Sequence, residues 1–412
     1  MSERDAFLAL NLLPFTPAEL RRCLARCGSA ASALEEAASA PPPPASDPPA
    51  PPRSQVPLDR GAARRLGAEG LLRLARLEVR RAASESVRIE TLADPGYPAA
   101  LREIPDPPPV LYIGGTLGAD DEARLAIVGS RRASDYGLEA AELLAADLAR
   151  AGAVIVSGLA RGIDARAHRG ALDAGGRTLA VLGSGLGRVY PGEHRLLARR
   201  IAEKGGAVLS EYPFEMPPLS HCFPRRNRVI SGLCAGTVVV EAAKASGALG
   251  TARLALEQGR EVFAVPGPVT LPTSIGTNGL LRAGAAHIAC VAQDVLDELP
   301  AVTRVRLGLP EGTDQESRQL RRAAIGRPLG APVPVSVARA FARGAEPGGG
   351  DLETAGLLRH LRSGEPLSID ELVARCGWPV PRALAALAIL ETQGLVVTLP
   401  GDRVARARTR LV

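Results

Sequence analysis

The run Phe223-Pro224-Arg225-Arg226-Asn227-Arg228 contains residue types suited to contact a phosphate or a nucleobase. An arginine guanidinium matches the geometry of a phosphate and can stack on a base, and a neighbouring Phe offers a second stacking surface. Aromatic residues make up only 3% of the chain, so general abundance does not explain a Phe here. On charge alone, a solvated helix start accounts for the run equally well.

Three small-residue turns elsewhere in the chain are further candidates for anion binding. Their members are Gly129, Ser130 and Arg131; Gly158, Arg161 and Gly162; and Lys244, Ser246 and Gly247. Each turn precedes a predicted helix, whose first N–H groups bind anions, and glycine lets a phosphate approach closely. The alternative for each is a tight turn beside a surface cation. The third turn lacks the Gly-Lys-Ser/Thr ending of a P-loop, so nucleotide hydrolysis is not predicted.

Other chemical motifs are weaker. Ser157, Asp164 and His168 lie near one another in the sequence, but the local glycines do not form a nucleophile elbow. We expect Asp164 to cap the following helix, and His168 either to pack or to lie on the phosphate side. The glycine spacing at 183–187 differs from a dinucleotide fingerprint and favours a simple turn. Glu211 and Glu241 each end a strand singly. We therefore predict no catalytic residue, no metal and no cofactor.

The elements that must position these turns are alternating strands and helices. Apolar runs predict strands at Leu125–Val128, Ala153–Val156, Thr178–Leu182, Ala207–Ser210, Thr237–Val240 and Glu261–Val265. Helices are expected near 137–151, 164–174, 193–204, 226–234 and 249–258. This alternation predicts an α/β fold with a mostly parallel sheet covered on both faces. Ligands of such sheets bind beyond the carboxyl ends of the strands, where the glycine turns and polar residues fall.

The flanking regions have different textures. Residues 1–90 are predicted to be a helical domain with a proline-rich insertion at 41–57. The core domain is predicted at 91–300, and its first part, 91–115, is expected to be an irregular connector. Residues 301–350 are predicted to be a linker. Residues 351–412 contain three predicted short helices, at 351–361, 368–376 and 381–393, and a hairpin around 395–404, which is the layout of a winged helix.

Composition limits the class of protein. A net charge of +6 over 412 residues favours an anionic partner. The six cysteines form no Cys-x-x-Cys pair, which indicates reduced thiols in a cytoplasmic protein. No apolar run reaches membrane-spanning length, and no membrane partner is expected.

Taken together in chain order, these turns resemble the DNA-processing protein A family over residues 91–290. The matching segments follow the family's order and spacing, and they include IVGSRRASDYG, SGLARGIDARAHRGAL, VYPGEH, LSEYP, FPRRNRVISGL and SGALGTARLALEQGREVFAVPG.

The resemblance implies an extended Rossmann-like core that binds single-stranded DNA and forms a homodimer through that core. It implies an N-terminal domain like a sterile alpha motif and delivery of a RecA-type recombinase onto the bound strand during natural transformation. A single-strand-binding protein is a further expected partner. The family's motifs fall on the first two turns, on Ser246 and Gly247 of the third, and on Phe223, Arg225, Asn227 and Arg228, with Lys244 as a nearby cation. Arg226 falls at a variable position and is expected to face water.

We therefore expect a non-enzymatic protein that binds and protects single-stranded DNA. About four neutralised phosphates would give a salt slope near −3. Two alternatives stay open, an enzyme that cleaves a nucleoside phosphate and a winged-helix transcription regulator. The winged-helix segment PRALAALAILETQG has few side chains that could read bases, which favours a protein contact there.

Overall fold

The computed structural model describes residues 1–39, 58, 60–120 and 122–309, and in the C-terminal part 367–376, 387, 390, 396–399 and 403–406. Contacts divide the chain into two compact units, Met1–Gly312 and Thr313–Val412. The proline-rich insertion, most of the predicted linker, the predicted helix at 351–361 and most of the predicted helix at 381–393 lie outside the described residues. Among the residues described, no helix is long and apolar enough to cross a membrane.

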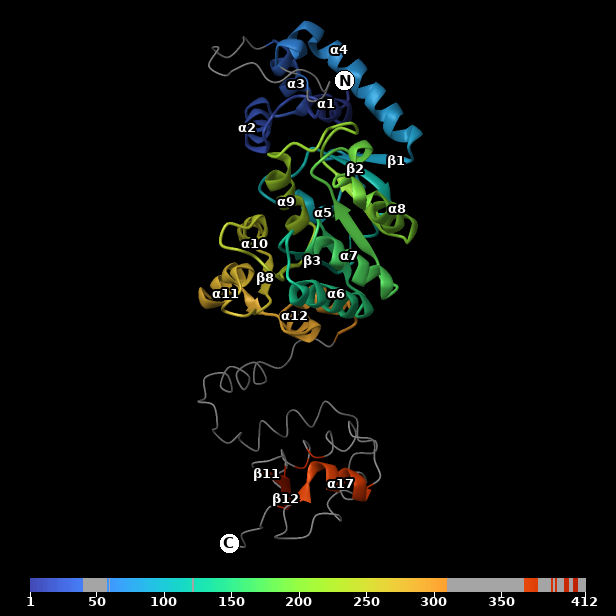
Figure 1. The fold of residues 1–412 in the computed structure, drawn as a ribbon. Coiled ribbons are helices and arrows are strands. Elements are labelled where there is room, and N and C mark those ends of the chain that lie inside the picture. The colour runs from blue at the N-terminus through green and yellow to red at the C-terminus, as the bar shows by residue number, and fades with distance from the viewer. Residues whose placement is uncertain are drawn as a thin grey trace. The chain divides into compact units, whose positions relative to one another are not determined.

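A nine-stranded sheet forms the centre of the first unit (Figure 1). Its strands are β1 (Val87–Thr91), β2 (Val110–Gly115), β3 (Arg124–Val128), β4 (Val154–Ser157), β5 (Thr178–Val181), β6 (Ala207–Ser210), β7 (Gly236–Val239), β8 (Glu261–Ala264) and β9 (His287–Ile288). The spatial order is β1-β2-β6-β5-β4-β3-β7-β8-β9. The strands from β6 to β9 pair in parallel, and β1 and β2 extend the sheet antiparallel.

The six predicted strands are confirmed, and each boundary differs by at most one residue. The prediction of an irregular connector at 91–115 was wrong for its last part, because β2 occupies Val110–Gly115. Because prolines are closely spaced before Val110, the prediction missed this strand, whose first four residues are buried and apolar.

Helices cover both faces of the sheet. Figure 1 shows α9 (Cys222–Gly232) and α10 (Gly247–Glu257) on one side, and α6 (Asp135–Arg150), α7 (Ile163–Asp173) and α8 (Arg195–Glu203) on the other. Alternate residues of β3 serve the two cores. Leu125 and Ile127 pack with α6 and α7, whereas Ala126 and Val128 pack with α9 and α10. Burial on both faces explains why the strands read as continuous apolar runs.

Shorter elements complete this unit. They are α5 (Ala99–Arg102), η1 (Leu186–Arg188), η2 (Gly192–His194), η3 (Pro272–Ser274), α11 (Ile275–Arg282), α12 (Ala292–Asp297) and α13 (Ala301–Arg306).

Four N-terminal helices pack against the antiparallel edge of the sheet. They are α1 (Glu3–Leu10), α2 (Pro17–Cys27), α3 (Ala30–Ser39) and α4 (Arg60–Ser84). Their core includes Ile89 of β1 and Val110 and Tyr112 of β2. The predicted boundary between residues 90 and 91 therefore cuts a strand, and these helices belong to the same compact unit as the sheet.

The second unit contains a small antiparallel sheet of the order β10-β12-β11. Its described elements are β10 (Leu367–Ser368), α17 (Ile369–Cys376), β11 (Val396–Leu399) and β12 (Arg403–Arg406). The predicted hairpin is confirmed by the pairing of β11 with β12. Ser368 and Glu371 exchange side chain-to-backbone hydrogen bonds at the start of α17, which stabilises its first turn.

Candidate nucleic-acid interface

The first two glycine turns touch each other beyond the carboxyl ends of β3 and β4. A Cβ on Gly162, whose φ is +74°, would lie 2.3 Å from the carbonyl oxygen of Ser130, so only glycine fits. The amide of Ile163 donates to that same oxygen at 3.2 Å. Within the described residues, the amides of Arg131, Arg161 and Gly162 donate to no acceptor. The N–H groups of Arg161 and Gly162, directly before α7, and that of Arg131, in the turn after β3, suit an anion.

The remaining members of the two turns have structural roles. The Ser130 amide donates to the carbonyl oxygen of Glu241 at 2.8 Å, and Gly129 packs against the side chain of Ile163. The amide of Gly158 is buried and donates to the Asp164 carboxylate at 3.1 Å. Gly158 therefore does not offer its N–H group to a ligand.

Arg131, Phe223 and Tyr190 form a stack beside these turns. The guanidinium carbon of Arg131 lies 5.3 Å from the centre of the Phe223 ring, a cation–π contact. The rings of Phe223 and Tyr190 lie 5.6 Å apart at 58°. A Cβ on Gly183 would lie 2.7 Å from the Phe223 ring, so this glycine makes room for the aromatic side chain. Arg131 and Tyr190 are exposed and Phe223 is half-buried.

Phe223 and the basic run lie within α9, because this helix begins at Cys222, four residues before the predicted start. Successive side chains of a helix point in different directions, so the run is divided among several surroundings. The expectation that Arg226 faces water was wrong. Its guanidinium is buried and donates to the carbonyl oxygens of Gly158, at 3.0 Å, and Val181. Burial lowers the pKa of Arg226 to about 10, against the opposing influence of Asp164.

Arg228 is also buried, which corrects its predicted role as a direct phosphate contact. Its guanidinium donates to both carboxylate oxygens of Glu211 at 2.7 Å, and to the carbonyl oxygens of Asp106 and Arg225. Desolvation opposes its charge, but the Glu211 carboxylate outweighs this effect and raises the pKa of Arg228. Arg228 thus ties α9 to the end of β6.

Arg225 is half-buried and lies away from the stack. With Arg228 it lines a cavity of about 610 Å³ between α2 and the core. The structure therefore does not gather the three arginines of the run at one surface.

Arg161 is exposed but paired. Its Nε and Nη2 donate to the two carboxylate oxygens of Glu193 at 2.6 and 2.8 Å. This ion pair raises the pKa of Arg161 and lowers that of Glu193. Because both side chains are about half exposed, the pair is weak enough for a phosphate to replace the carboxylate.

The third turn adjoins α9 at the start of α10. Ser246 caps this helix by accepting a hydrogen bond from the Ala248 amide at 3.3 Å. The Asn227 amide group donates to the carbonyl oxygen of Gly247 at 3.4 Å, which links α9 to α10. Lys244 is exposed, and no ion pair joins it or Arg131 to an acidic residue in the part of the chain that the structure describes.

Buried polar residues under the turns hold them in place. The Glu241 carboxylate accepts from the amide and hydroxyl of Ser134, at 2.9 and 2.5 Å, and so fixes the start of α6. Asp164 accepts from the amides of Gly158 and Ala160, whereas the prediction had it as the helix cap, a position that Gly162 occupies.

His168 packs, which is one of its two expected roles, and is fully buried, with Nδ1 2.6 Å from the hydroxyl of Thr178. Burial lowers the pKa of His168 to about 3, so this ring is neutral at physiological pH.

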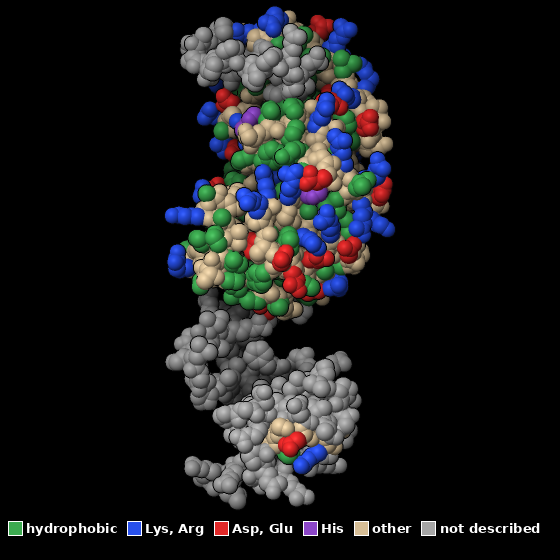
Figure 2. All heavy atoms as spheres, in the orientation of Figure 1, with side chains coloured by type: hydrophobic (Ala, Val, Ile, Leu, Met, Phe, Trp, Pro, Cys, Tyr) green, Lys and Arg blue, Asp and Glu red, His purple; other side chains and the backbone are tan. Residues whose placement is uncertain are grey.

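Basic and apolar side chains meet across the middle of the face shown in Figure 2, while acidic side chains gather lower on that face. The sequence reasoning did not pick out Tyr190 and Glu193 individually. Both lie in the VYPGEH segment between β5 and α8, whose resemblance to the family motif was the available signal.

Comparisons with known proteins match this architecture. The family model described as DNA recombination-mediator protein A matches residues 88–300, and the DprA winged helix domain matches residues 342–402. Protein Smf of Escherichia coli is 39% identical over 75% of this chain and 74% of its own length. DNA processing protein DprA of Bacillus subtilis is 44% identical over 50% of this chain and 68% of its own.

Among solved structures, DNA processing protein A of Streptococcus pneumoniae aligns with a TM-score of 0.49 and 38% identity, over 56% of this chain and 82% of that one. The match to the core model spans the whole parallel sheet with its glycine turns and α9. This chain therefore belongs to the DprA/Smf family of DNA recombination mediators.

Proposed function

We propose that this protein binds single-stranded DNA across the carboxyl edge of its parallel sheet. The observation that carries this proposal is the exposed guanidinium of Arg131 stacked on Phe223, directly beside the two touching glycine turns. A cation, an aromatic ring and unengaged amides within one surface match the two parts of a nucleotide. The ring suits the face of a base, and the cation and amides suit the adjacent phosphate.

The geometry favours a single strand over a duplex. Phe223 and Tyr190 can stack only on a base whose face is open, and the bases of a duplex are already stacked on one another. Arg131 contacts one phosphate in this arrangement. Arg161 contacts a second phosphate after it gives up its ion pair with Glu193, and Lys244 extends the row of exposed cations toward α10.

Fluorescence anisotropy with labelled oligonucleotides tests this proposal. We expect the full chain to bind a mixed-sequence single strand at least about 10-fold more tightly than the same sequence as a duplex. Phe223→Leu keeps an apolar side chain over Gly183 but removes the aromatic face, and should weaken single-strand binding by about 10-fold, within the range for one stacked base. Equal affinity for both DNA forms, or an unchanged Phe223→Leu, would contradict it.

We further propose that this protein passes the bound strand to a RecA-type recombinase. It does so even when a single-strand-binding protein already coats the DNA. Membership of a family of recombination mediators supports this step. The recombinase's DNA-dependent ATPase on coated single strands should start sooner when this protein is added. An Arg131→Ala protein should lose the stimulation in proportion to its lost DNA binding. Stimulation that survives the loss of DNA binding would separate the two functions.

A second copy of this chain is the proposed cover for the β9 edge of the sheet. Apolar side chains on β9 and on the segments around it are exposed. They include Val269, Ile275, Ile288 and Val291. Exposed apolar clusters beside an unpaired strand edge favour association. Figure 2 shows hydrophobic side chains over the region where Figure 1 places α11 and β8. Light scattering should give a dimer for the native protein and a monomer for Ile288→Asp.

A further inference from the structure

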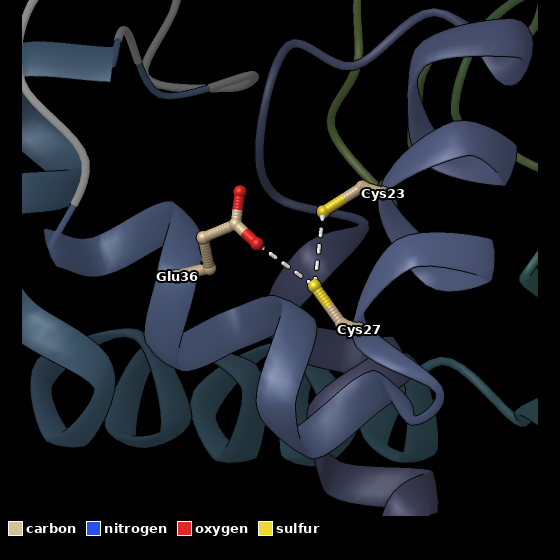
Figure 3. A group of neighbouring side chains, drawn as sticks. All are labelled: Cys23, Cys27 and Glu36. Atoms are coloured by element: carbon tan, nitrogen blue, oxygen red, sulfur yellow. Dashed lines mark hydrogen bonds between the residues drawn. The ribbon is translucent and has the colours of Figure 1, made fainter.

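The N-terminal helices bring two thiols and a carboxylate together, away from the DNA-binding surface. Cys23 and Cys27 lie one turn apart near the end of α2, and Glu36 comes from α3 (Figure 3). The two sulfur atoms are 4.0 Å apart, and Cys27 Sγ lies 2.9 Å from Glu36 Oε2. One ligand atom from each of these three residues lies within 4.8 Å of the other two.

Local structure fixes this meeting of helices. A capping box between Thr16 and Glu19 starts α2, and Gly28, with a φ of +77°, ends it directly after Cys27. The short connection turns the chain back so that α3 packs against α2. The carboxylate of Glu3 holds the start of α3 by accepting from the amides of Ala30 and Ala31.

We propose that Cys23, Cys27 and Glu36 form a binding site for a thiophilic divalent cation of the Zn²⁺ class. Thiolate and carboxylate ligands suit this ion, and tetrahedral coordination at a Zn–S distance of about 2.3 Å places two sulfur atoms about 3.8 Å apart. The observed 4.0 Å separation needs almost no adjustment. The same geometry needs an S···O distance of about 3.5 Å, so Glu36 Oε2 must move outward by about half an ångström. The Glu36 side chain is 42% exposed and has room to do so.

The charges around the site balance when the ion is present. Binding releases one proton from each thiol to solvent and leaves two thiolates and one carboxylate around a doubly charged cation. Arg26 already donates from Nη2 to Glu36 Oε1 and from Nε to Oε2 at 3.3 Å, while Oε2 also faces the Cys27 sulfur at 2.9 Å. Two thiolates, one carboxylate, one guanidinium and one divalent cation sum to zero. Arg26 thus orients the ligating carboxylate as outer-sphere partners do in metal sites.

Three protein ligands leave one tetrahedral position for water. Cys23 is 6% exposed, while Cys27 and Glu36 are more accessible, so the ion can enter from the solvent side. The bound ion would join α2 to α3 and stabilise the N-terminal helices. This inference does not depend on the DNA-binding proposal, because none of its residues belongs to the proposed interface.

The test uses the full chain, reduced with a phosphine and stripped of metal with a chelator. Titration with Co²⁺ should give one ion per chain, with a thiolate-to-cobalt charge-transfer band that added Zn²⁺ abolishes. Glu36→Gln should weaken binding at least about 10-fold, and Cys27→Ser at least about 100-fold, because even outer-sphere partners contribute 10- to 100-fold. Glu35→Gln and Cys290→Ser are the matched controls, since both residues are exposed and lie outside the site.

A footprint on the native protein covers the case in which Cys27→Ser fails to fold. Zn²⁺ should protect Cys27 from alkylation, identified by mass spectrometry, while Cys290 stays reactive in the same sample. Binding well below one ion per chain overturns the proposal. So does equal alkylation of Cys27 with and without Zn²⁺, or a Glu36→Gln protein that binds Co²⁺ like the Glu35→Gln control.

Discussion

Replacement of Arg131 by Ala tests the proposed interface most directly. Arg131 is exposed, has no acidic partner among the residues that the structure describes, and lies over Phe223. Its removal eliminates one cation without breaking an ion pair, so the fold should be unaffected. A hydrogen bond to a charged group contributes modestly at an exposed position, and we expect about a 10-fold loss of single-strand affinity at moderate salt.

The salt dependence gives a sharper number. Each neutralised phosphate contributes about −0.7 to the slope of log affinity against log salt for single strands. Of the cations predicted to contact phosphates, the structure leaves Arg131, Arg161 and Lys244 exposed, whereas Arg225 is half-buried and Arg228 is held by Glu211 inside the protein. The expected slope is therefore about −2, instead of the value near −3 that the sequence suggested, and Arg131→Ala should reduce it to about −1.4.

The assay is anisotropy titration of a labelled single strand at four or five salt concentrations. Arg150→Ala is the control, since it removes the same charge at the last residue of α6, the end far from Arg131, and breaks only an exposed ion pair with Asp147. Parallel lines for the native protein and Arg131→Ala would refute the assigned role of Arg131, even if the affinity fell. A native slope of −4 or steeper would show that the cations counted here are not the main phosphate contacts.

Three further changes probe the surroundings of the interface. Glu193→Gln frees Arg161 from its ion pair and should tighten single-strand binding by up to about 5-fold in the anisotropy titration. Weaker binding of this variant would contradict the prediction. Arg228→Ala leaves the buried Glu211 carboxylate without its partner and should lower the free energy of unfolding by about 3–5 kcal/mol, measured with urea, and a loss below about 1 kcal/mol would contradict this. His168 has a folded pKa of about 3 against about 6.5 when unfolded, so the unfolded state binds the extra proton and stability falls as the pH drops below about 6.5. Between about pH 7 and 5.5 this costs about 1 kcal/mol, and His168→Gln should lose that part of the pH dependence of urea unfolding, whereas an unchanged pH profile would count against it.

The parallel sheet was predictable because its strands are buried on both faces. Runs such as Leu125–Val128 and Ala207–Leu209 are apolar throughout and end at glycine or polar residues, so composition alone locates them. The antiparallel edge was not predictable in the same way. β2 follows a proline-dense stretch, and its pairing with β1 and β6 depends on residues far away in the sequence.

The division of the basic run could not be predicted from the chain. Three arginines within four residues have the same chemistry, and the start of α9 decides that Arg226 and Arg228 point inward. The helix was expected to begin near residue 226, but proline is tolerated in the first turn, and the helix begins before Pro224. Arg226 donates to backbone carbonyls of the turn after β4 and of the last residue of β5, and no sequence pattern reveals these partners.

The small number of available cations has a consequence for binding at physiological salt. With a slope of about −2, a rise from 50 to 200 mM salt weakens binding about 16-fold, whereas a slope of −3 would give about 64-fold. Stacking on Phe223 and hydrogen bonds from backbone amides depend little on salt, so they carry a larger share of the remaining affinity. The net charge of +6 therefore overstates the electrostatic part of the proposed interface, because the buried guanidinium groups of Arg226 and Arg228 hold α9 in place and do not reach the surface.

A comparison of two variants separates the contributions of stacking and phosphate contact. A Phe223→Leu protein should lose single-strand affinity by the same factor at low and high salt, while the loss of affinity in Arg131→Ala should shrink as salt rises. Identical salt dependence of the two losses would mean that stacking and phosphate contact are not separate contributions at this site.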